Sequence, residues 1–271
     1  MSIPERADRS KPAESLPVDL ADTIENELVP RMMLAHRVGA VPPSVGAAVG
    51  RKLSDADRAE FIRLIRGSSE TAAGDLVNRL VENGTTVESV YLDLLAPAAR
   101  FMGQEWDNDS CDFVEVTIAL GRMQRVLRNH SRVEGAEKPL NTAVGSILLS
   151  AAPGEQHTLG LYIVAEFFVR AGWAVQVGSP VAELDLVRTV REDWFDVVGF
   201  SVYCDTKLPH LARDIAAVRK HSRNPKVRLL VGGQVFEGNS TLLESLGADG
   251  SAIDGIQAVQ VATDLLGLSP A

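Results

Sequence analysis

Short apolar runs alternate with amphipathic segments through the second half of this chain, and this alternation restricts the possible folds more than any other feature. The apolar runs lie at residues 144–152, 173–179, 195–203, 227–236 and 248–254. Strands that are apolar along their whole length are typical of a parallel sheet covered by helices on both faces. We therefore predict a flavodoxin-like α/β domain over residues 142–271, with five parallel strands and with ligands bound beyond their carboxyl ends.

Residues 53–131 follow a different pattern, because their apolar side chains recur at three- and four-residue spacing. Predicted helices begin after Ser54, near residue 68, at Thr85/Thr86 and after Asp112. Short connections between amphipathic helices favour a four-helix bundle. Residues 1–52 are expected to form an N-terminal tail with a short helix and a linker that contains Pro and Gly.

Composition excludes several classes of protein. The 27 Lys and Arg residues against 36 Asp and Glu leave a net charge of −9, which argues against a large sequence-independent nucleic-acid surface. Two cysteines, Cys111 and Cys204, are too few for a disulfide framework or a four-cysteine zinc site. No apolar run approaches a membrane span of ~18 residues and the polar start lacks a signal-peptide core, so a cytoplasmic protein is expected.

One basic cluster stands out against the acidic composition. Its members are Arg219, Lys220, His221, Arg223 and Lys226. We interpret the cluster as a solvated face, with contact to DNA phosphates in a ternary complex as the alternative.

A histidine follows the first predicted strand, at the carboxyl edge of the sheet. The connection reads APGEQHTLG over residues 152–160 and places His157 where the next helix begins. A helix N-terminus disfavours the imidazolium form, so a neutral ring nitrogen of His157 is available to a metal. Glu155 is able to accept the other ring N–H and fix the tautomer. By itself, a Glu-x-His sequence on a loop is most simply a surface histidine.

Small residues mark three further positions around this edge. Gly160 lies inside a predicted helix, where glycine costs ~1 kcal/mol relative to alanine. The third strand ends at Ser201, and the fourth ends at Gly232 and Gly233. Together these residues outline a slot with His157 at its mouth. Ordinary packing glycines in a flavodoxin-like domain are the alternative explanation.

These motifs resemble the cobalamin-binding domain family of corrinoid enzymes and sensors. That family carries D-x-H-x-x-G, S-x-L and G-G, which appear here as EQHTLG (155–160), SVY (201–203) and GG (232–233). The resemblance implies that His157 is the lower axial ligand of cobalt and that the displaced dimethylbenzimidazole tail fills the slot. It assigns the slot to Gly160, Ser201, Gly232 and Gly233, and further cofactor contacts to Glu155, Gln156, Thr158, Val202 and Tyr203.

The chain departs from the family pattern at two positions. Glu155 replaces the usual aspartate, and Tyr203 replaces the usual leucine. These changes bear on cofactor affinity and tail orientation more than on the axial bond. Adenosylcobalamin or hydroxocobalamin is the expected cofactor, with haem, which related domains carry, as the alternative.

The segment MGQEWDNDSCDFVEVTIAL (102–120) is similar to the bundle of light-sensing cobalamin regulators, in which a tryptophan covers an adenosyl group. Trp106 is the matching residue, and a core or domain-interface position is its alternative role. Those regulators carry a Glu-His pair further along, but Val116 and Thr117 occupy those positions here. The resemblance therefore implies a bundle that caps the upper corrin face without that second histidine.

The whole arrangement, including SAAPGEQHTLG (150–160), most closely resembles the AerR/PpaA group of cobalamin-binding antirepressors. This resemblance implies a light-responsive transcriptional regulator of photosynthesis genes rather than an enzyme. Its expected partner is a DNA-binding repressor of the CrtJ/PpsR type, with DNA contacted only indirectly or weakly and no membrane involved. A corrinoid carrier protein of a methyltransferase system, which would use the same His157, is the alternative.

Overall fold

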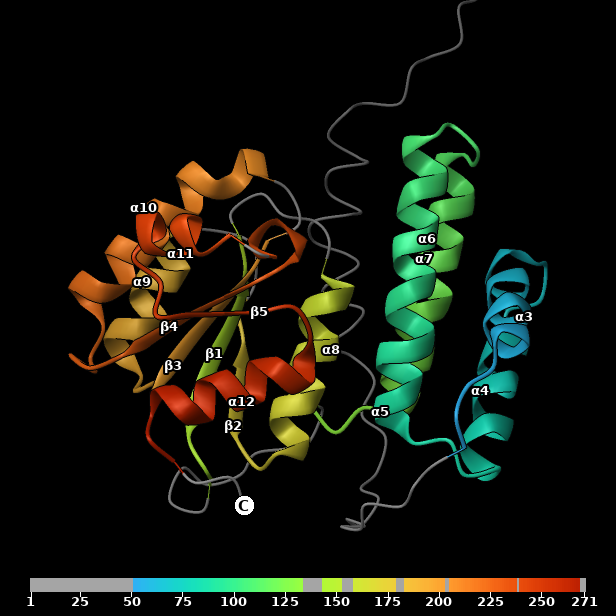
Figure 1. Ribbon diagram of the computed structural model, residues 1–271, viewed down its shortest axis with the longest axis horizontal. Helices are drawn as coiled ribbons and strands as arrows, with labels where there is room; N and C mark the ends of the chain where they lie inside the picture. The colour runs from blue at the N-terminus through green and yellow to red at the C-terminus, as the bar shows by residue number, and fades with distance from the viewer. Residues whose placement is uncertain are drawn as a thin grey trace, which may run out of the picture. The chain divides into compact units, whose positions relative to one another are not determined.

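The computed structural model describes residues 51–133, 143–152, 158–178, 183–202, 205–237 and 239–268. All of its described helices and strands belong to one compact unit, Pro43–Ala271, which contains a helical part and an α/β part (Figure 1). The predicted tail and linker lie almost entirely outside the described residues. No helix within the described ranges is long and apolar enough to cross a membrane.

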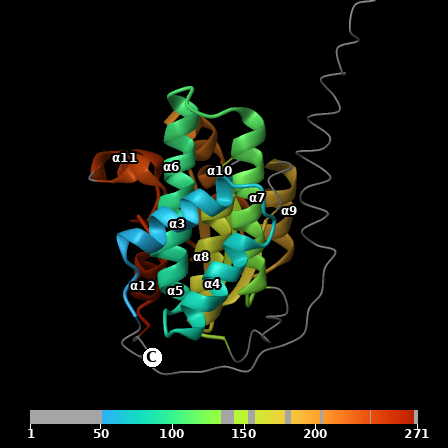
Figure 2. The same cartoon turned by 90° about the vertical axis from the view of Figure 1, so that its right-hand side faces the viewer.

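The helical part consists of the four predicted helices, one of them subdivided (Figure 2). The elements are α3 (Asp55–Arg66), α4 (Ala72–Glu82), α5 (Val87–Ser89), the π-helical segment η2 (Val90–Leu95), α6 (Ala96–Asp107) and α7 (Phe113–Asn129). Capping boxes at Ser54 and Asp112 fix the starts of α3 and α7, because each side chain accepts a hydrogen bond from the third helical N–H. The helix predicted from Thr85/Thr86 is capped by Thr86 and runs through α5, η2 and α6.

Pro97 offers a physical reason for the π-helical segment. A proline has no N–H for the carbonyl four residues back, and its ring crowds that carbonyl. Here that carbonyl belongs to Asp93, and Arg58 Nε donates to it instead at 2.9 Å. The prediction of one regular helix was therefore too simple in this segment, because sequence periodicity does not reveal which side chain satisfies a displaced carbonyl.

The α/β part contains the predicted parallel sheet. Its strands are β1 (Ser146–Ala151), β2 (Ala174–Val177), β3 (Val197–Ser201), β4 (Arg228–Gly232) and β5 (Gly250–Ala252). Their order is β2-β1-β3-β4-β5 and all pairings are parallel, so the flavodoxin-like prediction is confirmed. The covering helices are α8 (Leu159–Arg170), α9 (Glu183–Glu192), α10 (Leu208–His221), α11 (Ser240–Leu246) and α12 (Gly255–Leu265), with 3-10 turns η4 (Asp205–Lys207) and η5 (Gln234–Phe236).

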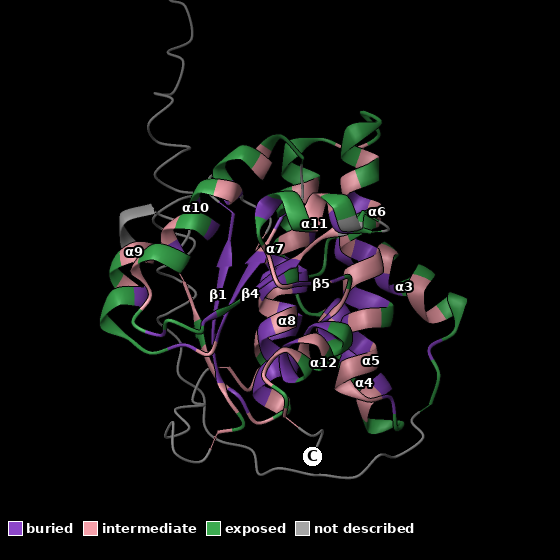
Figure 3. Ribbon diagram, turned by 60° about the vertical axis from the view of Figure 1, so that its left-hand side comes forward, coloured by how far each residue is buried: buried purple, intermediate pink, exposed green. Residues whose placement is uncertain are grey.

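Two hydrophobic clusters cover the two faces of the sheet. Side chains of α8 and α12, including Phe168 and Ala262, pack with Ile147 and Leu149 of β1 on one face. Side chains of α10 and α11, together with Val190 of α9, pack on the other face. Strands β1, β3 and β4 are accordingly the buried centre of this part, as the purple β1 and β4 in Figure 3 illustrate, whereas β2 is partly exposed.

Helix α8 belongs to both parts of the molecule. Leu161, Ala165 and Phe168 pack against the sheet. Leu159, Ile163 and Phe167, spaced four residues apart, instead pack into the core of the helical part. A helix that is apolar on nearly all sides is expected to be buried on all sides, and α8 meets that expectation.

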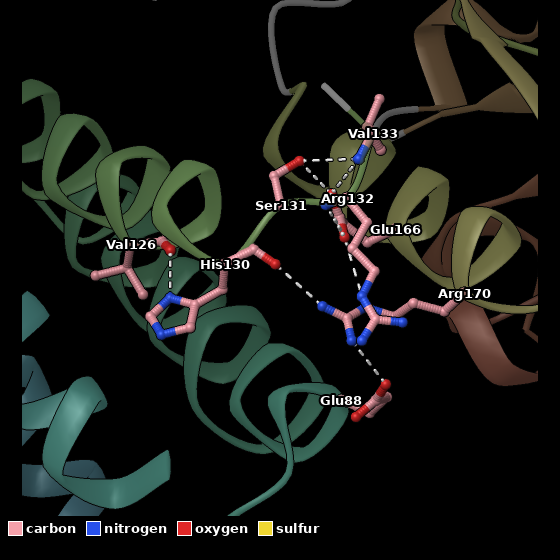
Figure 4. A network of polar contacts seen from close by, with 8 residues as sticks. All are labelled: Glu88, Val126, His130, Ser131, Arg132, Val133, Glu166 and Arg170. Atoms are coloured by element: carbon pink, nitrogen blue, oxygen red, sulfur yellow. Dashed lines mark hydrogen bonds and ion pairs between the residues drawn. The ribbon is translucent and has the colours of Figure 1, made fainter. Parts of the chain in front are cut away.

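A polar network at the C-terminal half of α8 joins the two parts (Figure 4). We call it the α8 joint; it comprises Glu88, Tyr91, His130, Ser131, Arg132, Val133, Glu166 and Arg170. The buried Glu166 carboxylate accepts from the Ser131 hydroxyl and from the N–H groups of Arg132 and Val133, the last two at 2.9 Å and 3.1 Å. Each of these hydrogen bonds links α8 to the chain that leaves α7.

Arg170 completes the joint one helical turn further along α8. Its guanidinium pairs with Glu88 at 3.0 Å and with Glu166 at 3.5 Å, and it donates to the His130 carbonyl at 3.0 Å. It also lies 5.6 Å from the ring centroid of Tyr91. Burial raises the pKa of the Tyr91 hydroxyl well above its usual range, so this side chain stays neutral.

Candidate cofactor site

Four small residues form a row across the carboxyl edge of the sheet. The strand register pairs Ala151 with Ser201, Ser201 with Gly232, and Gly232 with Ala252. Residues paired in this way point to the same face of a parallel sheet, and adjacent strands are about 4.8 Å apart. At these paired positions, where four neighbouring strands end, no side chain is therefore larger than that of serine.

Gly233 continues this edge in a backbone conformation that other residues rarely adopt. Its φ is +132°, and an added Cβ would lie 1.8 Å from the carbonyl oxygen of Val202. Gly232 accepts the Val202 N–H at 2.9 Å, so the ends of β3 and β4 are held together by main-chain contacts alone. Gly233 is therefore required locally, independently of any ligand, whereas a Cβ on Gly232 would lie 3.3 Å from the Ala252 carbonyl oxygen.

Val202 and Ser201 contribute to this edge in different ways. The Val202 side chain is buried in the core cluster beneath α10, so only its main chain faces the edge. Ser201 is partly exposed, and its carbonyl accepts the N–H of Ala152 at 2.9 Å. Of the predicted SVY motif, Ser201 is thus the described residue whose side chain is available to a ligand.

Open space lies beside the first turn of α8. A Cβ added to Gly160 would meet no heavy atom within 4 Å. Thr158, the preceding cap residue, is partly exposed and makes no side-chain capping hydrogen bond. Gly160, Ser201, Gly232 and Gly233 are exposed or partly exposed, so they fit a bulky group entering at this edge, whereas Ala151 and Ala252 are buried against α8 and α12.

Several predicted site residues lie outside the described residues. These are Glu155, Gln156, His157 and Tyr203. The connection that contains His157 leaves β1 at the buried Ala152 and returns at Thr158, directly before α8. Within the described ranges, no three His, Cys, Asp or Glu side chains gather in a metal-binding group.

Trp106 is neither a core residue nor part of a described packing interface. It is 46% exposed near the end of α6, and its ring packs edge-on against Phe113 of α7 with centroids 6.4 Å apart. Val114 and Ile118, one turn apart on α7, are exposed as well. We call Trp106, Phe113, Val114 and Ile118 the hairpin surface. Large exposed apolar groups of this kind mark binding surfaces.

Sequence reasoning identified Trp106 but missed the other members of the hairpin surface. The available signal was the spacing of Val114, Thr117 and Ile118, which repeats an exposed face along α7. Ile253 and Ile256, each 59% exposed, were also missed. Ile253 directly follows β5 at the carboxyl edge, and Ile256 lies in the first turn of α12. Apolar side chains next to a row of small residues are candidates for cofactor contact.

Comparisons with known proteins give the class of this α/β part. Residues 145–261 match the B12 binding domain family. Over 163 residues the chain is 29% identical to an uncharacterized 20.5 kDa protein in the bchF-crtJ intergenic region of Rhodobacter capsulatus, covering 60% of this chain and 84% of that protein. It is also 27% identical over 216 residues to a corrinoid protein of Desulfitobacterium hafniense (strain Y51), covering 77% and 96%.

A solved structure supports the fold. The monomethylamine corrinoid protein of Methanosarcina barkeri superposes with a TM-score of 0.63 at 16% identity, covering 78% of this chain and 97% of that one. The α/β part of the present chain thus shares the fold of that corrinoid protein. Its match to the B12 binding domain family over residues 145–261 supports cobalamin as the cofactor. The arrangement of small strand ends and open space at the start of α8 is consistent with that cofactor.

Proposed function

We propose that this protein is a light-responsive cobalamin sensor that regulates transcription through a DNA-binding repressor, and that it is not an enzyme. The observation that carries the proposal is the row of small strand ends beside the open first turn of α8. When bound, cobalamin supplies a cobalt centre whose upper ligand is exchangeable, and an adenosyl upper ligand makes that exchange light-dependent.

In this proposal His157 would be the lower axial ligand of cobalt; the sequence places it directly before Thr158, which precedes α8. Glu155 accepts the second ring N–H of His157 and so fixes the tautomer, as carboxylates do for metal-bound histidines. Gly160, Ser201, Gly232 and Gly233 accommodate the nucleotide tail. Gln156, Thr158, Val202 and Tyr203 provide further contacts to the cofactor, with Val202 contributing through its main chain.

The hairpin surface covers the upper ligand. Trp106 and Phe113 give it two rings, and Val114 and Ile118 extend it along α7. Because Val116 and Thr117 stand where related regulators carry Glu and His, a second protein ligand is not available from that turn of α7. The role proposed for Trp106 is therefore to shield the upper ligand from water, and not to take the place of that ligand.

Helix α8 links the cofactor to the helical part. It starts one residue after Thr158, packs through Leu159 and Ile163 into the core of the helical part, and ends in the α8 joint. A change of ligand alters the protein only through different contacts in its two states. We propose that these contacts are those of the hairpin surface and that α8 carries their difference to the surface that binds the repressor.

The proposed partner is a repressor of the CrtJ/PpsR type. The resemblance to the AerR/PpaA group supports this partner, as does the location of the Rhodobacter capsulatus relative in the bchF-crtJ intergenic region. The net charge of −9 fits a regulator that reaches DNA mainly through another protein.

Absorption spectroscopy tests the cofactor arrangement. Purified protein mixed with adenosylcobalamin or hydroxocobalamin is expected to bind and to show the spectrum of histidine-ligated cobalt, with light changing the adenosyl form. His157→Ala should lose that spectrum and weaken binding at least about tenfold, a loss of about 1.4 kcal/mol. His210→Ala, at an exposed position on α10, is the matched control and should behave as the wild type. An unchanged spectrum in His157→Ala would falsify the axial-ligand assignment.

Repressor binding tests the regulatory part of the proposal. Affinity for a candidate repressor, measured in darkness and after illumination, should change for the adenosylcobalamin-bound protein and stay constant for the cofactor-free protein. Trp106→Ala should reduce the difference between the two states while leaving the His157-dependent spectrum in place. A repressor affinity that is the same with and without cofactor would rule out the switch.

A corrinoid carrier of a methyltransferase system remains the second candidate, because the corrinoid protein of Desulfitobacterium hafniense aligns with 77% of this chain. A carrier needs an open upper face, so illumination of the adenosyl form should then leave partner affinity unchanged. Methyl transfer to bound cob(I)alamin by a partner enzyme would support the carrier, and its absence together with light-dependent repressor binding would support the sensor.

A further inference from the structure

We propose that the amino edge of the sheet carries a binding surface for the phosphate backbone of duplex DNA. This surface, called here the amino-edge surface, consists of Arg188, Arg191, Arg219, Lys220, Arg223, Lys226 and Arg228, all of which are exposed. It lies at the end of the sheet opposite the carboxyl edge, so its occupation does not compete with the cofactor. The inference goes beyond the proposed function and does not depend on cofactor binding.

Contacts between α9, α10 and the start of β4 bring these residues together on one surface. The C-terminal ends of α9 and α10 meet where Arg191 lies 3.4 Å from His221 Nδ1. Arg223 donates to the Glu192 carbonyl at 3.0 Å, which ties the segment after α10 to the end of α9. Arg219 and Arg228 both approach Asp249, at 2.9 Å and 3.9 Å.

Carboxylates at this edge do not neutralise the surface. The Asp196 carboxylate accepts hydrogen bonds from the Ser146 hydroxyl and from the Trp194 indole N–H. The Asp249 carboxylate accepts the Leu229 N–H at 2.7 Å. Glu192 pairs with Arg188. Among the described residues, Lys220, Arg223 and Lys226 have no carboxylate partner within ion-pair distance, and neither has Arg191, which faces His221. Four cations therefore remain available.

Local helix energetics explain only part of the cluster. Arg191, Arg219 and Lys220 lie in the last turns of α9 and α10, where cations complement the helix dipole. Arg223, Lys226 and Arg228 lie outside any helix, so the dipole gives no reason for them. A surface that gathers both groups is better explained by an anionic partner.

The chemistry of the surface favours a polyanion over an acidic protein segment. Arginine binds phosphate through paired N–H groups of its guanidinium. Arg223 is held by the Glu192 carbonyl through Nη1, and Arg219 by the Gly247 carbonyl and by Asp249. An acidic protein segment would also need apolar contacts, for which this edge offers the exposed Trp194. The seven cations are spread over three element ends. This spacing suits the repeated charges of a DNA backbone better than it suits a single compact anion.

Binding to DNA by this surface alone is expected to be weak. The chain as a whole has a net charge of −9, which repels DNA at long range. A few phosphate contacts give dissociation constants on the order of 10⁻⁵ M and a strong dependence on salt. Such a surface contributes most when a partner already holds the protein close to DNA.

The test compares two triple charge reversals that have the same effect on net charge. K220E/R223E/K226E reverses three of the four cations of the amino-edge surface that have no carboxylate partner. K52E/R79E/R100E, at exposed positions of the helical part, is the control. Each triple reversal lowers the net charge by six, from −9 to −15. A difference between them therefore reports the location of the charge rather than its amount.

The probe is a fluorescein-labelled duplex of about 30 base pairs, titrated with cofactor-free full-length protein at salt from about 50 to 200 mM. We expect K220E/R223E/K226E to bind at least tenfold more weakly than the control and to lose about 2–3 units of salt slope. Circular dichroism verifies folding, and K220Q/R223Q/K226Q replaces the reversal if it unfolds the protein.

Three outcomes would overturn the proposal. These are no binding of the wild type at low salt, equal loss in both triple variants, and binding of poly-glutamate but not of duplex DNA. The last outcome would reassign the surface to an acidic protein partner. Because neither cobalamin nor a repressor is present, failure here leaves the proposed sensor function to its own tests.

Discussion

Glycines at the carboxyl edge illustrate how one residue type serves two purposes. Gly233 is required by the backbone, because its φ is +132° and a Cβ would overlap the Val202 carbonyl. Gly160 has no such requirement, since nothing lies within 4 Å of an added Cβ. The sequence motif predicted both positions, but only the structure separates the structural glycine from the one that leaves space.

Alanine substitutions are expected to separate these two roles. Gly233→Ala should lower the free energy of unfolding by about 2–4 kcal/mol, because the conformation is strained for alanine and the Cβ clashes. Gly160→Ala should leave stability unchanged or raise it by up to about 1 kcal/mol, since alanine favours the helix. It should nevertheless weaken cobalamin binding. Urea unfolding and cofactor titration measure the two effects, and unimpaired binding by Gly160→Ala would contradict its place beside the tail.

Asp57 gives the start of α3 a dependence on pH. Hydrogen bonds from the Ser54 side chain and backbone, and the charge of Arg51, hold the pKa of Asp57 below its usual value. A lowered pKa in the folded state means that the stabilisation is present above the unfolded pKa and is lost as pH falls through the folded pKa.

We therefore expect Asp57→Asn to be less stable than the wild type by about 1 kcal/mol near neutral pH, as for loss of a helix cap. The difference should shrink below about pH 4, where the wild-type carboxylate becomes protonated. Urea unfolding across this pH range measures it. A difference that stays constant down to low pH would show that the charge of Asp57 has no role.

Helix α8 is the element on which the two parts depend. Its start was predicted at His157, two residues before the observed start at Leu159. Its packing into the helical part was not predicted, because a helix that is apolar on most sides does not reveal which neighbour covers each side. The α8 joint was equally invisible, since Glu166 and Arg170 look like an ordinary i, i+4 surface pair in the sequence.

Breaking the α8 joint should be costly. Glu166→Gln and Arg170→Met each remove one partner from a buried network, and loss of about 3–5 kcal/mol is typical for such a change. Arg188→Met is the control, because the Arg188–Glu192 pair is exposed and worth less than about 1 kcal/mol. Urea denaturation provides the measurement. Equal effects at Glu166 and Arg188 would mean that the joint does not hold the two parts together.

The molecule as a whole is built so that the two parts share one helix. The core of the helical part includes Leu159, Ile163 and Phe167 of α8, while the opposite side of α8 packs on β1. Unfolding of the sheet would remove α8 from the helical part and expose its core. The two parts are therefore expected to unfold as one cooperative unit.

Tryptophan reporters test this cooperativity. Trp106 lies in the helical part, and the buried Trp173 lies at the start of β2. In each variant that retains only one of them, with the other tryptophans replaced by Phe, the urea midpoint from tryptophan fluorescence should agree within error with the midpoint from far-UV circular dichroism. Separate midpoints would mean that the parts unfold independently. Glu166→Gln is expected to be the variant that separates them.

Alternation of apolar runs and helices determined the parallel sheet, its helices and the carboxyl edge, because each depends on local periodicity and on the right-handed connection of parallel strands. The motifs determined Ser201, Gly232 and Gly233 as edge residues for the same reason. Only the tertiary structure decided that Ala151 and Ala252 complete the row, that α8 is shared, and that cations of α9, α10 and β4 meet at the amino edge. Register and contacts between distant segments depend on packing, which a linear pattern does not specify.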